Sequence, residues 1–140
     1  MVEAALVVGD ADDGLRERLD AEINAFNAAA TGIGDGRLLC VSVRGDGGDL
    51  HGGLFGWTWG GCGYVEFLWV RHDQRGSGLG TRLLAAAEQE IRRRGCAQVA
   101  LSTHSFQAPG FYARLGYREC GRTPAYPRGY DQIHLVKRLD

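Results

Sequence analysis

The stretch that decides this fold is Val70-Arg71-His72-Asp73-Gln74-Arg75-Gly76-Ser77-Gly78-Leu79-Gly80-Thr81. The residues before it, from Tyr64, have the character of a strand. After it, apolar residues recur from Leu79 to Ile91 at the three- and four-residue spacing of a helix. Glycines between a strand and a helix let the backbone approach a ligand closely, and the first helical amides lack partners. The positive helix end and Arg75 then predict a bound phosphate or pyrophosphate.

Three kinds of phosphate loop compete for this stretch, beside a glycine-rich turn without a ligand. A nucleotide P-loop needs Lys before its final Ser or Thr, but Leu79-Gly80-Thr81 has none. A dinucleotide loop needs glycine where Thr81 stands, and an acid after the next strand, where Leu101-Ser102-Thr103 stands. The third pattern, Arg-x-x-Gly-x-Gly, is met by Arg75, Gly78 and Gly80. A nucleotide-binding oxidoreductase remains an alternative that competition between NAD and CoA would test.

The flanking pattern predicts a mixed α/β fold (α+β) with helices on both faces of one mixed sheet. Strand, helix and strand over residues 64–102 require a right-handed crossover, so those two strands should be parallel neighbours. Three strands linked by glycine turns should form an antiparallel meander before them. The expected strands are Val2–Val8, Leu38–Val43, Leu50–Trp59, Tyr64–Val70, Val99–Ser102, Tyr117–Cys120 and Asp131–Val136. The expected helices are 13–30, one that begins at Leu79 and ends before Gly95, and Pro109–Leu115.

Composition narrows the class of protein. The 140 residues, 44% apolar and 24% charged, suit one globular domain spanning 1–140. No apolar run is long enough to cross a membrane, and the acidic N-terminus favours a cytoplasmic protein. The net charge of −1 excludes a generally basic nucleic-acid binder. The scattered cysteines and histidines predict no metal site.

The second half of the chain carries a further motif. Ala108-Pro109-Gly110-Phe111-Tyr112-Ala113-Arg114-Leu115-Gly116-Tyr117 follows the glycine loop by about thirty residues. Together the two motifs and the element order resemble the GNAT (GCN5-related N-acetyltransferase) superfamily. The resemblance implies that the two parallel strands splay apart and hold acetyl-CoA between them. Because homodimers are common in this superfamily, the resemblance is also compatible with a homodimer.

That resemblance implies a set of cofactor contacts. The pyrophosphate would lie on Arg75, Gly76, Ser77, Gly78, Leu79, Gly80 and Thr81, and the pantetheine arm would pair with the backbone of Leu68, Trp69 and Val70. Ser105 stands where the family often has an asparagine that contacts the pantetheine arm. The family usually has two helices between its first two strands, whereas this chain has room for one.

Acetyl transfer to an amine needs a base for the amine proton and an acid for the leaving thiolate. Alternation along Tyr64, Glu66, Leu68 and Val70 predicts one common face that leads to the loop, with Glu66 as the base. A relay through His72 or His104 is the alternative. The resemblance makes Tyr112 the acid at the coenzyme sulfur. A backbone N–H near residues 68–70 would polarise the carbonyl.

The acceptor is less well defined by the sequence. The first 66 residues hold four basic and eleven acidic residues, whereas the rest hold twelve and six. This imbalance favours a cationic acceptor: a polyamine, an aminoglycoside, an amino-acid derivative, or a protein N-terminus or lysine. Candidate acceptor contacts are Asn24, Asn27, Phe55, Trp57, Trp59, Tyr126 and Tyr130. The sequence therefore predicts direct N-acetylation of a primary amine by acetyl-CoA, the alternative being a non-catalytic acyl-CoA sensor.

Overall fold

The computed structural model describes residues 4–140, which form two compact units divided after Gly34. The predicted first strand is wrong for residues 4–8, which have no regular structure, and its Val2 and Glu3 lie outside the described residues. Leu6, Val7 and Val8 are 88–100% exposed. An apolar run alone does not make a strand, because its N–H and C=O groups also need a neighbouring strand to bond.

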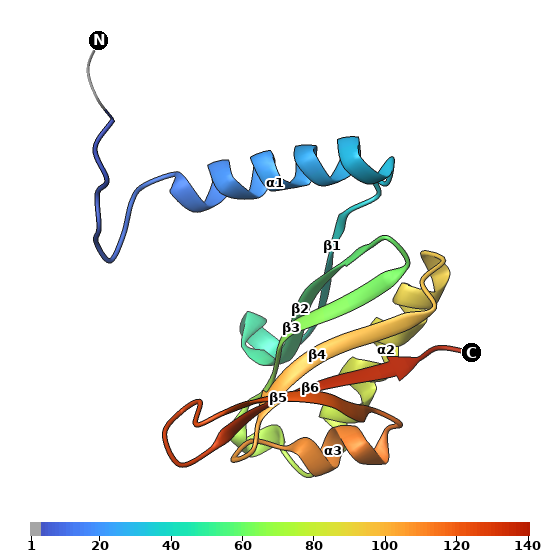
Figure 1. Cartoon of the computed structure of the whole chain (residues 1–140). Coiled ribbons are helices and arrows are strands. Elements are labelled where there is room, and N and C mark those ends of the chain that lie inside the picture. Colours follow the sequence, from blue (N-terminus) through green and yellow to red (C-terminus); the bar gives the residue numbers. More distant parts are fainter. Residues whose placement is uncertain (1–3) are drawn as a thin grey trace. The chain divides into compact units, whose positions relative to one another are not determined.

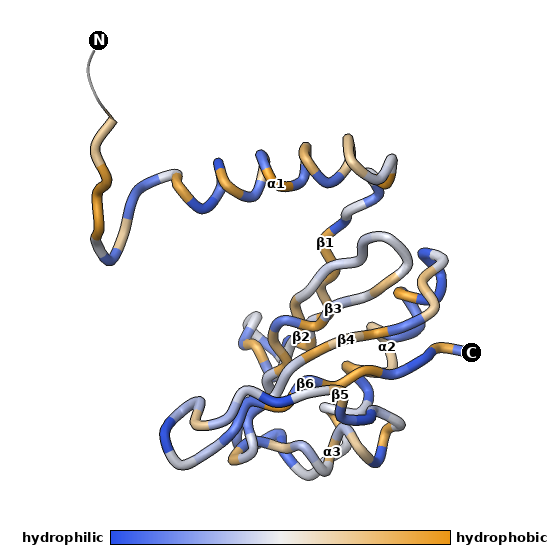
Figure 2. Tube along the Cα trace, in the orientation of Figure 1, coloured by the Kyte–Doolittle hydropathy of each residue, from blue (hydrophilic) through white to orange (hydrophobic). Residues whose placement is uncertain are grey.

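The predicted first helix is confirmed as α1, Leu15–Thr31. Left-handed glycines flank it: Gly14 precedes it without a side-chain cap, and the Gly32 N–H closes it by donating to the Ala28 oxygen at 2.8 Å. Figure 2 shows the alternation of hydrophobic and hydrophilic residues along this helix. The spacing of Leu15, Leu19, Ile23 and Phe26 in the sequence places these four apolar residues on one side of the helix.

The second unit is built on one six-stranded mixed sheet with strand order β1-β2-β3-β4-β6-β5 (Figure 1). Its strands are β1 Arg37–Arg44, β2 Leu50–Trp59, β3 Cys62–Val70, β4 Gln98–His104, β5 Arg118–Pro124 and β6 Asp131–Arg138. The helices are α2 Leu79–Arg93 and α3 Pro109–Arg114, with short 3-10 turns η1 Asp46–Gly48 and η2 His72–Gln74. The antiparallel meander β1-β2-β3 and the parallel pair β3/β4 are both confirmed.

The core lies on one face of this sheet, beneath α2 and α3. The apolar face of α2 is buried as its spacing predicts, with Leu83, Leu84, Ala87 and Ile91 at most 1% exposed. Gly63 of β3 is needed beneath α2, because a Cβ there would overlap the Ile91 side chain. Phe111 of α3 lies close enough to Gly80 of α2 to contact a Cβ there. The N-terminal turn of α2 therefore packs against α3.

A buried polar cluster fastens α2 to the last strands. The Glu88 side chain, 6% exposed, accepts hydrogen bonds from the Tyr117 hydroxyl and the Lys137 ammonium, both at 2.8 Å. Burial of the phenol, and then its bond to the Glu88 carboxylate, raises the pKa of Tyr117 far above its ordinary value. Within residues 4–140, no helix is long and apolar enough to cross a membrane.

Candidate active site

The two parallel strands separate part-way along their length. β3 and β4 pair from Cys62–Gln98 to Val65–Leu101, and no pair follows. Beyond that point Leu68 and Val70 remain paired with β2 on the other side. One edge of β3 between Glu66 and Val70 is therefore open, and such an edge can bind an extended amide chain.

A β-bulge lies where the strands separate. In the β2/β3 register Gly56 opposes Val65 and Phe55 opposes Phe67, so Glu66 is an extra residue without a partner. The half-buried Glu66 carboxylate has no hydrogen bond or ion pair with residues 4–140. Glu66, the base predicted from the sequence, is therefore the residue that forms the bulge.

The bulge overturns one prediction about β3. Tyr64 opposes Trp57, and Leu68 opposes Leu54, which is buried in the core. Residues opposite each other on neighbouring strands have their side chains on the same face of the sheet. Along β2 the side chains alternate between faces, so Trp57 and Leu54, three positions apart, lie on opposite faces. The prediction that Tyr64 and Leu68 share one face is therefore wrong, because the extra residue shifts the alternation by one.

The glycine loop has the form that an anion site requires. Gly76 and Gly78 are left-handed at φ 78° and 85°, and Gly78 leads into α2 without a side-chain cap. Inside the loop the Ser77 hydroxyl donates to the Gln74 oxygen at 2.7 Å, and Arg75 Nε donates to the Val70 oxygen at 2.9 Å. The first amides of α2 remain available to a ligand, and the rest of the Arg75 guanidinium is exposed.

Tyr112 lies on α3 with its ring buried between Phe111 and Tyr117, whose centroids are 5.1 and 5.8 Å away. Its hydroxyl has no hydrogen-bond partner among residues 4–140. Every buried polar side-chain atom in that range does have a partner, so the Tyr112 oxygen must be accessible to solvent. Burial raises the pKa of Tyr112, so the phenol stays protonated at neutral pH. A free, protonated hydroxyl is suited to donating a proton.

The predicted histidine alternatives differ in their surroundings. His72 is exposed in η2. His104 ends β4, and its Nδ1 lies 3.0 Å from the Tyr126 carbonyl oxygen. Because a carbonyl only accepts, Nδ1 carries a proton and a neutral ring keeps its lone pair on Nε2. Ser105, the predicted pantetheine contact, accepts a bond from the Asp131 N–H at 3.0 Å, and its hydroxyl proton remains free to donate.

The candidate acceptor residues occupy several places. Trp57 stacks on Tyr64 with centroids 4.9 Å apart, and the Tyr64 hydroxyl lies 3.2 Å from the Ser102 Oγ. The sequence did not single out Tyr64 or Ser102, because only strand register brings them together. Asn24, bonded to Asp20 at 3.4 Å, and Asn27 belong to α1 in the first unit. Their contact with an acceptor stays a prediction.

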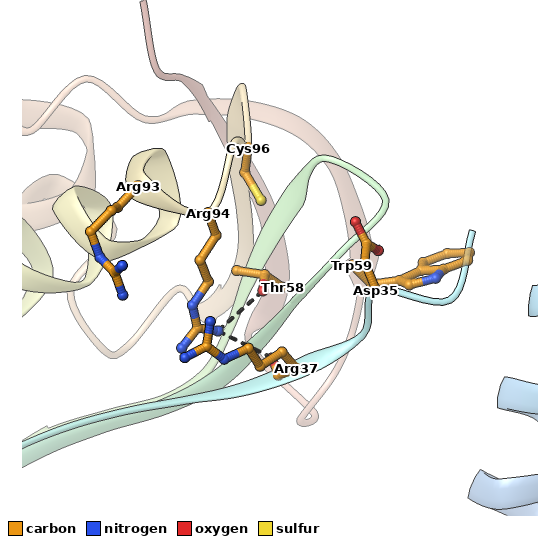
Figure 3. A pocket seen from close by; sticks show the side chains of 7 residues that line it. All are labelled: Asp35, Arg37, Thr58, Trp59, Arg93, Arg94 and Cys96. Carbon is orange, nitrogen blue, oxygen red and sulfur yellow. Dashed lines mark hydrogen bonds between the residues drawn. The ribbon is translucent and has the colours of Figure 1, made fainter.

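A pocket of about 290 Å³ lies at the other end of α2 (Figure 3). Arg37, Thr58, Arg94 and Cys96 line it with Asp35, Trp59 and Arg93. The Arg94 guanidinium donates hydrogen bonds to the Leu38 oxygen at 3.0 Å and to Thr58 Oγ1 at 3.1 Å. It also pairs with the Glu90 carboxylate of α2 at 2.9 Å. These bonds tie the end of α2 to β1 and β2. None of the predicted catalytic or cofactor residues lines this pocket, so we assign it a structural role.

A bulged strand, an open edge and an uncapped glycine loop make up the candidate site, and comparison with known proteins shows the family of the chain. The family model described as Acetyltransferase (GNAT) family matches residues 9–117. The chain belongs to the GNAT acetyltransferases. As a member of that family, it is an acyl-CoA-dependent acetyltransferase with acetyl-CoA as its co-substrate.

Relatives and solved structures agree with this assignment. Blasticidin-S acetyltransferase of Streptomyces morookaense is 46% identical over 99 residues, 68% of this chain and 71% of that protein. Acetyltransferase Atu2258 of Agrobacterium fabrum is 36% identical over 82% of this chain and 84% of its own length. The crystal structure of an acetyltransferase from Agrobacterium tumefaciens covers 98% of this chain and 100% of its own, with 32% identity and a TM-score of 0.89. The GNAT fold predicted from the two motifs is confirmed.

Proposed function

We propose that this acetyltransferase moves an acetyl group directly from acetyl-CoA to a primary amine of a small, cationic molecule or peptide. The acidic first half of the chain favours a cationic acceptor. Relatives named for acetylation of blasticidin S and of an aminoglycoside at its 2′-nitrogen also support an amine acceptor. We further propose that the whole chain, 1–140, acts as one acetyltransferase domain.

The proposed cofactor contacts follow from the open edge and the loop. Backbone groups of Leu68, Trp69 and Val70 on the free edge of β3 would bond the amides of the pantetheine arm, as an added strand does. The pyrophosphate would receive the amides of residues 76–81 and the Arg75 charge, because a helix N-terminus favours an anion. The Ser105 hydroxyl keeps one donor for the pantetheine arm.

The proposed chemistry uses two side chains and forms no covalent enzyme intermediate. Glu66 accepts a proton from the ammonium group, and the freed nitrogen attacks the thioester carbon. The carbon–sulfur bond then breaks, and Tyr112 donates its hydroxyl proton to the leaving thiolate. A backbone N–H of residues 68–70 polarises the carbonyl. The nitrogen releases its second proton to solvent as the acetamide forms, and free CoA leaves as the thiol. Solvent then takes the proton held by Glu66 and returns one to Tyr112.

The observation that carries this proposal is the Glu66 carboxylate, which has no partner among residues 4–140 and lies at the bulge where β3 and β4 separate. A carboxylate without a cationic partner can accept the amine proton and also attract the ammonium ion.

The test is thiol release from acetyl-CoA with a panel of amines, and mass spectrometry of the products. The panel holds blasticidin S, an aminoglycoside, spermidine and a short peptide. We expect one class to react and Glu66→Gln, which keeps the shape, to lower kcat at least about 100-fold. Binding of acetyl-CoA without acetylation of any amine would favour the sensor and refute the proposal.

A further inference from the structure

Four aromatic rings gather where β4 ends and the β5–β6 loop passes it. We call His104, Phe106, Tyr126 and Tyr130 the ring cluster. The His104 and Phe106 rings stack with centroids 5.6 Å apart, and Tyr126 meets His104 edge-on at 5.3 Å. Tyr130 meets Phe106 edge-on at 5.1 Å. Three of these side chains are about half exposed: Phe106 53%, Tyr126 53% and Tyr130 49%.

Hydrogen bonds fix both segments that carry the ring cluster. The Ser105 N–H donates to the Asp131 oxygen at 2.8 Å, and the Asp131 N–H donates to Ser105 Oγ at 3.0 Å. Within the loop the Tyr126 N–H donates to the Tyr130 oxygen at 3.0 Å, and the Ala125 N–H donates to the Asp131 carboxylate at 3.2 Å. The rings are therefore held in place before a ligand arrives, which reduces the ordering cost of binding.

Strand geometry places the ring cluster beside the proposed transfer site. Leu101 is the last residue of β4 that pairs with β3, and Ser102 follows it and contacts Tyr64. His104 lies two positions further along β4, about 7 Å, on the same face as Ser102. The ring cluster thus stands at the separating end of β4, on the face opposite the core.

The charges around the ring cluster decide what it can bind. The Asp131 carboxylate, which holds the loop through the Ala125 N–H, is ion-paired with Arg122 at 3.0 Å, and Arg122 also bonds Glu119 at 2.8 Å. The charge of Asp131 is therefore already balanced by a cation of the chain itself. Exposed aromatic faces stack favourably with another flat ring.

We propose that the ring cluster binds a flat aromatic or heteroaromatic group of the acceptor, while the amine of that acceptor reaches Glu66. This inference deepens the proposed function and rests on it for the position of the amine. It assigns the acceptor to the class of primary amines that carry a planar ring.

Two matched amines test this preference: 2-phenylethylamine and 2-cyclohexylethylamine, which have the same chain and ring size but differ in flatness. The variants are Phe106→Leu and Tyr130→Leu, which remove a flat ring from a half-exposed position. Tyr130→Phe keeps the ring and is the matched control. Each protein is checked by thermal melting, and kcat/KM for both amines is measured with acetyl-CoA.

We expect the unmodified chain and Tyr130→Phe to favour the flat amine by about three- to tenfold, the size of one aromatic contact. In both leucine variants the ratio should approach one, mainly through KM. Equal values in the unmodified chain, or an unchanged ratio in both leucine variants, would overturn the inference.

Binding measured without turnover separates this inference from the proposed function. Calorimetry with CoA present gives the affinity of the unmodified chain and its variants for both amines. A flat-ring preference that Phe106→Leu removes, in a protein that acetylates no amine, would refute the proposed function and keep the ring cluster as a binding site. Equal affinities in a chain that acetylates other amines would refute only the ring cluster.

Discussion

Replacement of Gly56 by alanine tests whether the bulge positions the strand that carries Glu66, the proposed base. Gly56 lies on β2 opposite Val65, one step before the bulge at Glu66. A Cβ at Gly56 would overlap the Tyr64 carbonyl oxygen and come within 3.1 Å of the Val65 Cα. Both neighbours are backbone atoms, so no side chain can rotate away and β3 itself must shift.

The expected loss of stability follows from that overlap. Overpacking of this kind costs about 2 kcal/mol, and the lower entropy of the unfolded alanine chain returns about 0.5 kcal/mol. The net loss of about 1.5 kcal/mol should lower Tm by about 6 °C. Gly121→Ala, in β5, is the control, because a Cβ there meets only the His134 ring at 3.8 Å. Its Tm should stay within about 2 °C of the unmodified value.

The same shift should appear in catalysis. Movement of β3 displaces Glu66 and the open edge, and misplacement by about 1 Å can cost up to about 100-fold in rate. We expect kcat/KM of Gly56→Ala to fall at least about tenfold at 25 °C, where thermal melting shows the protein folded. A folded Gly56→Ala variant with unchanged Tm and unchanged kcat/KM would refute the idea that the bulge fixes the site.

Three further predictions follow from the site and the core. Tyr112→Phe should lower kcat about 10²- to 10⁴-fold and leave Tm and the acetyl-CoA affinity measured by calorimetry nearly unchanged. A Tyr112→Phe variant that keeps more than half of the unmodified turnover would contradict the acid role. Gly78→Asp should abolish acetyl-CoA binding, whereas Gly78→Asn, of the same shape and equally tolerant of a left-handed backbone, should retain most of it; equal affinities would contradict an anion site. Burial and the bond to Glu88 raise the pKa of Tyr117 in the folded chain. The free energy that Tyr117 contributes to stability is therefore complete below pH 10, the ordinary tyrosine pKa, and declines as the pH rises above 10. Urea unfolding between pH 8 and 11 should show that decline, and Tyr117→Phe should flatten it; equal slopes would contradict the assignment to Tyr117.

Local patterns in the sequence were enough for most elements and for the glycine loop between β3 and α2. The glycines at 76, 78 and 80 and the apolar spacing from Leu79 to Ile91 specify a loop and a helix within one short segment. The crossover rule then makes β3 and β4 parallel neighbours. The same local logic failed for residues 4–8, where apolar character was present but a strand partner was not.

Only the tertiary structure decided the bulge and the ring cluster. The extra residue at Glu66 arises from how β3 pairs with β2, and the rings of His104 and Tyr126 meet across 22 positions of sequence. Ser105, chosen for its place in a motif, also bonds Asp131 across the end of β4. Register and long-range contacts are properties of pairs of segments, so a pattern read along one segment cannot specify them. Local sequence determined which chemistry the chain carries, and packing determined which side chains share the site.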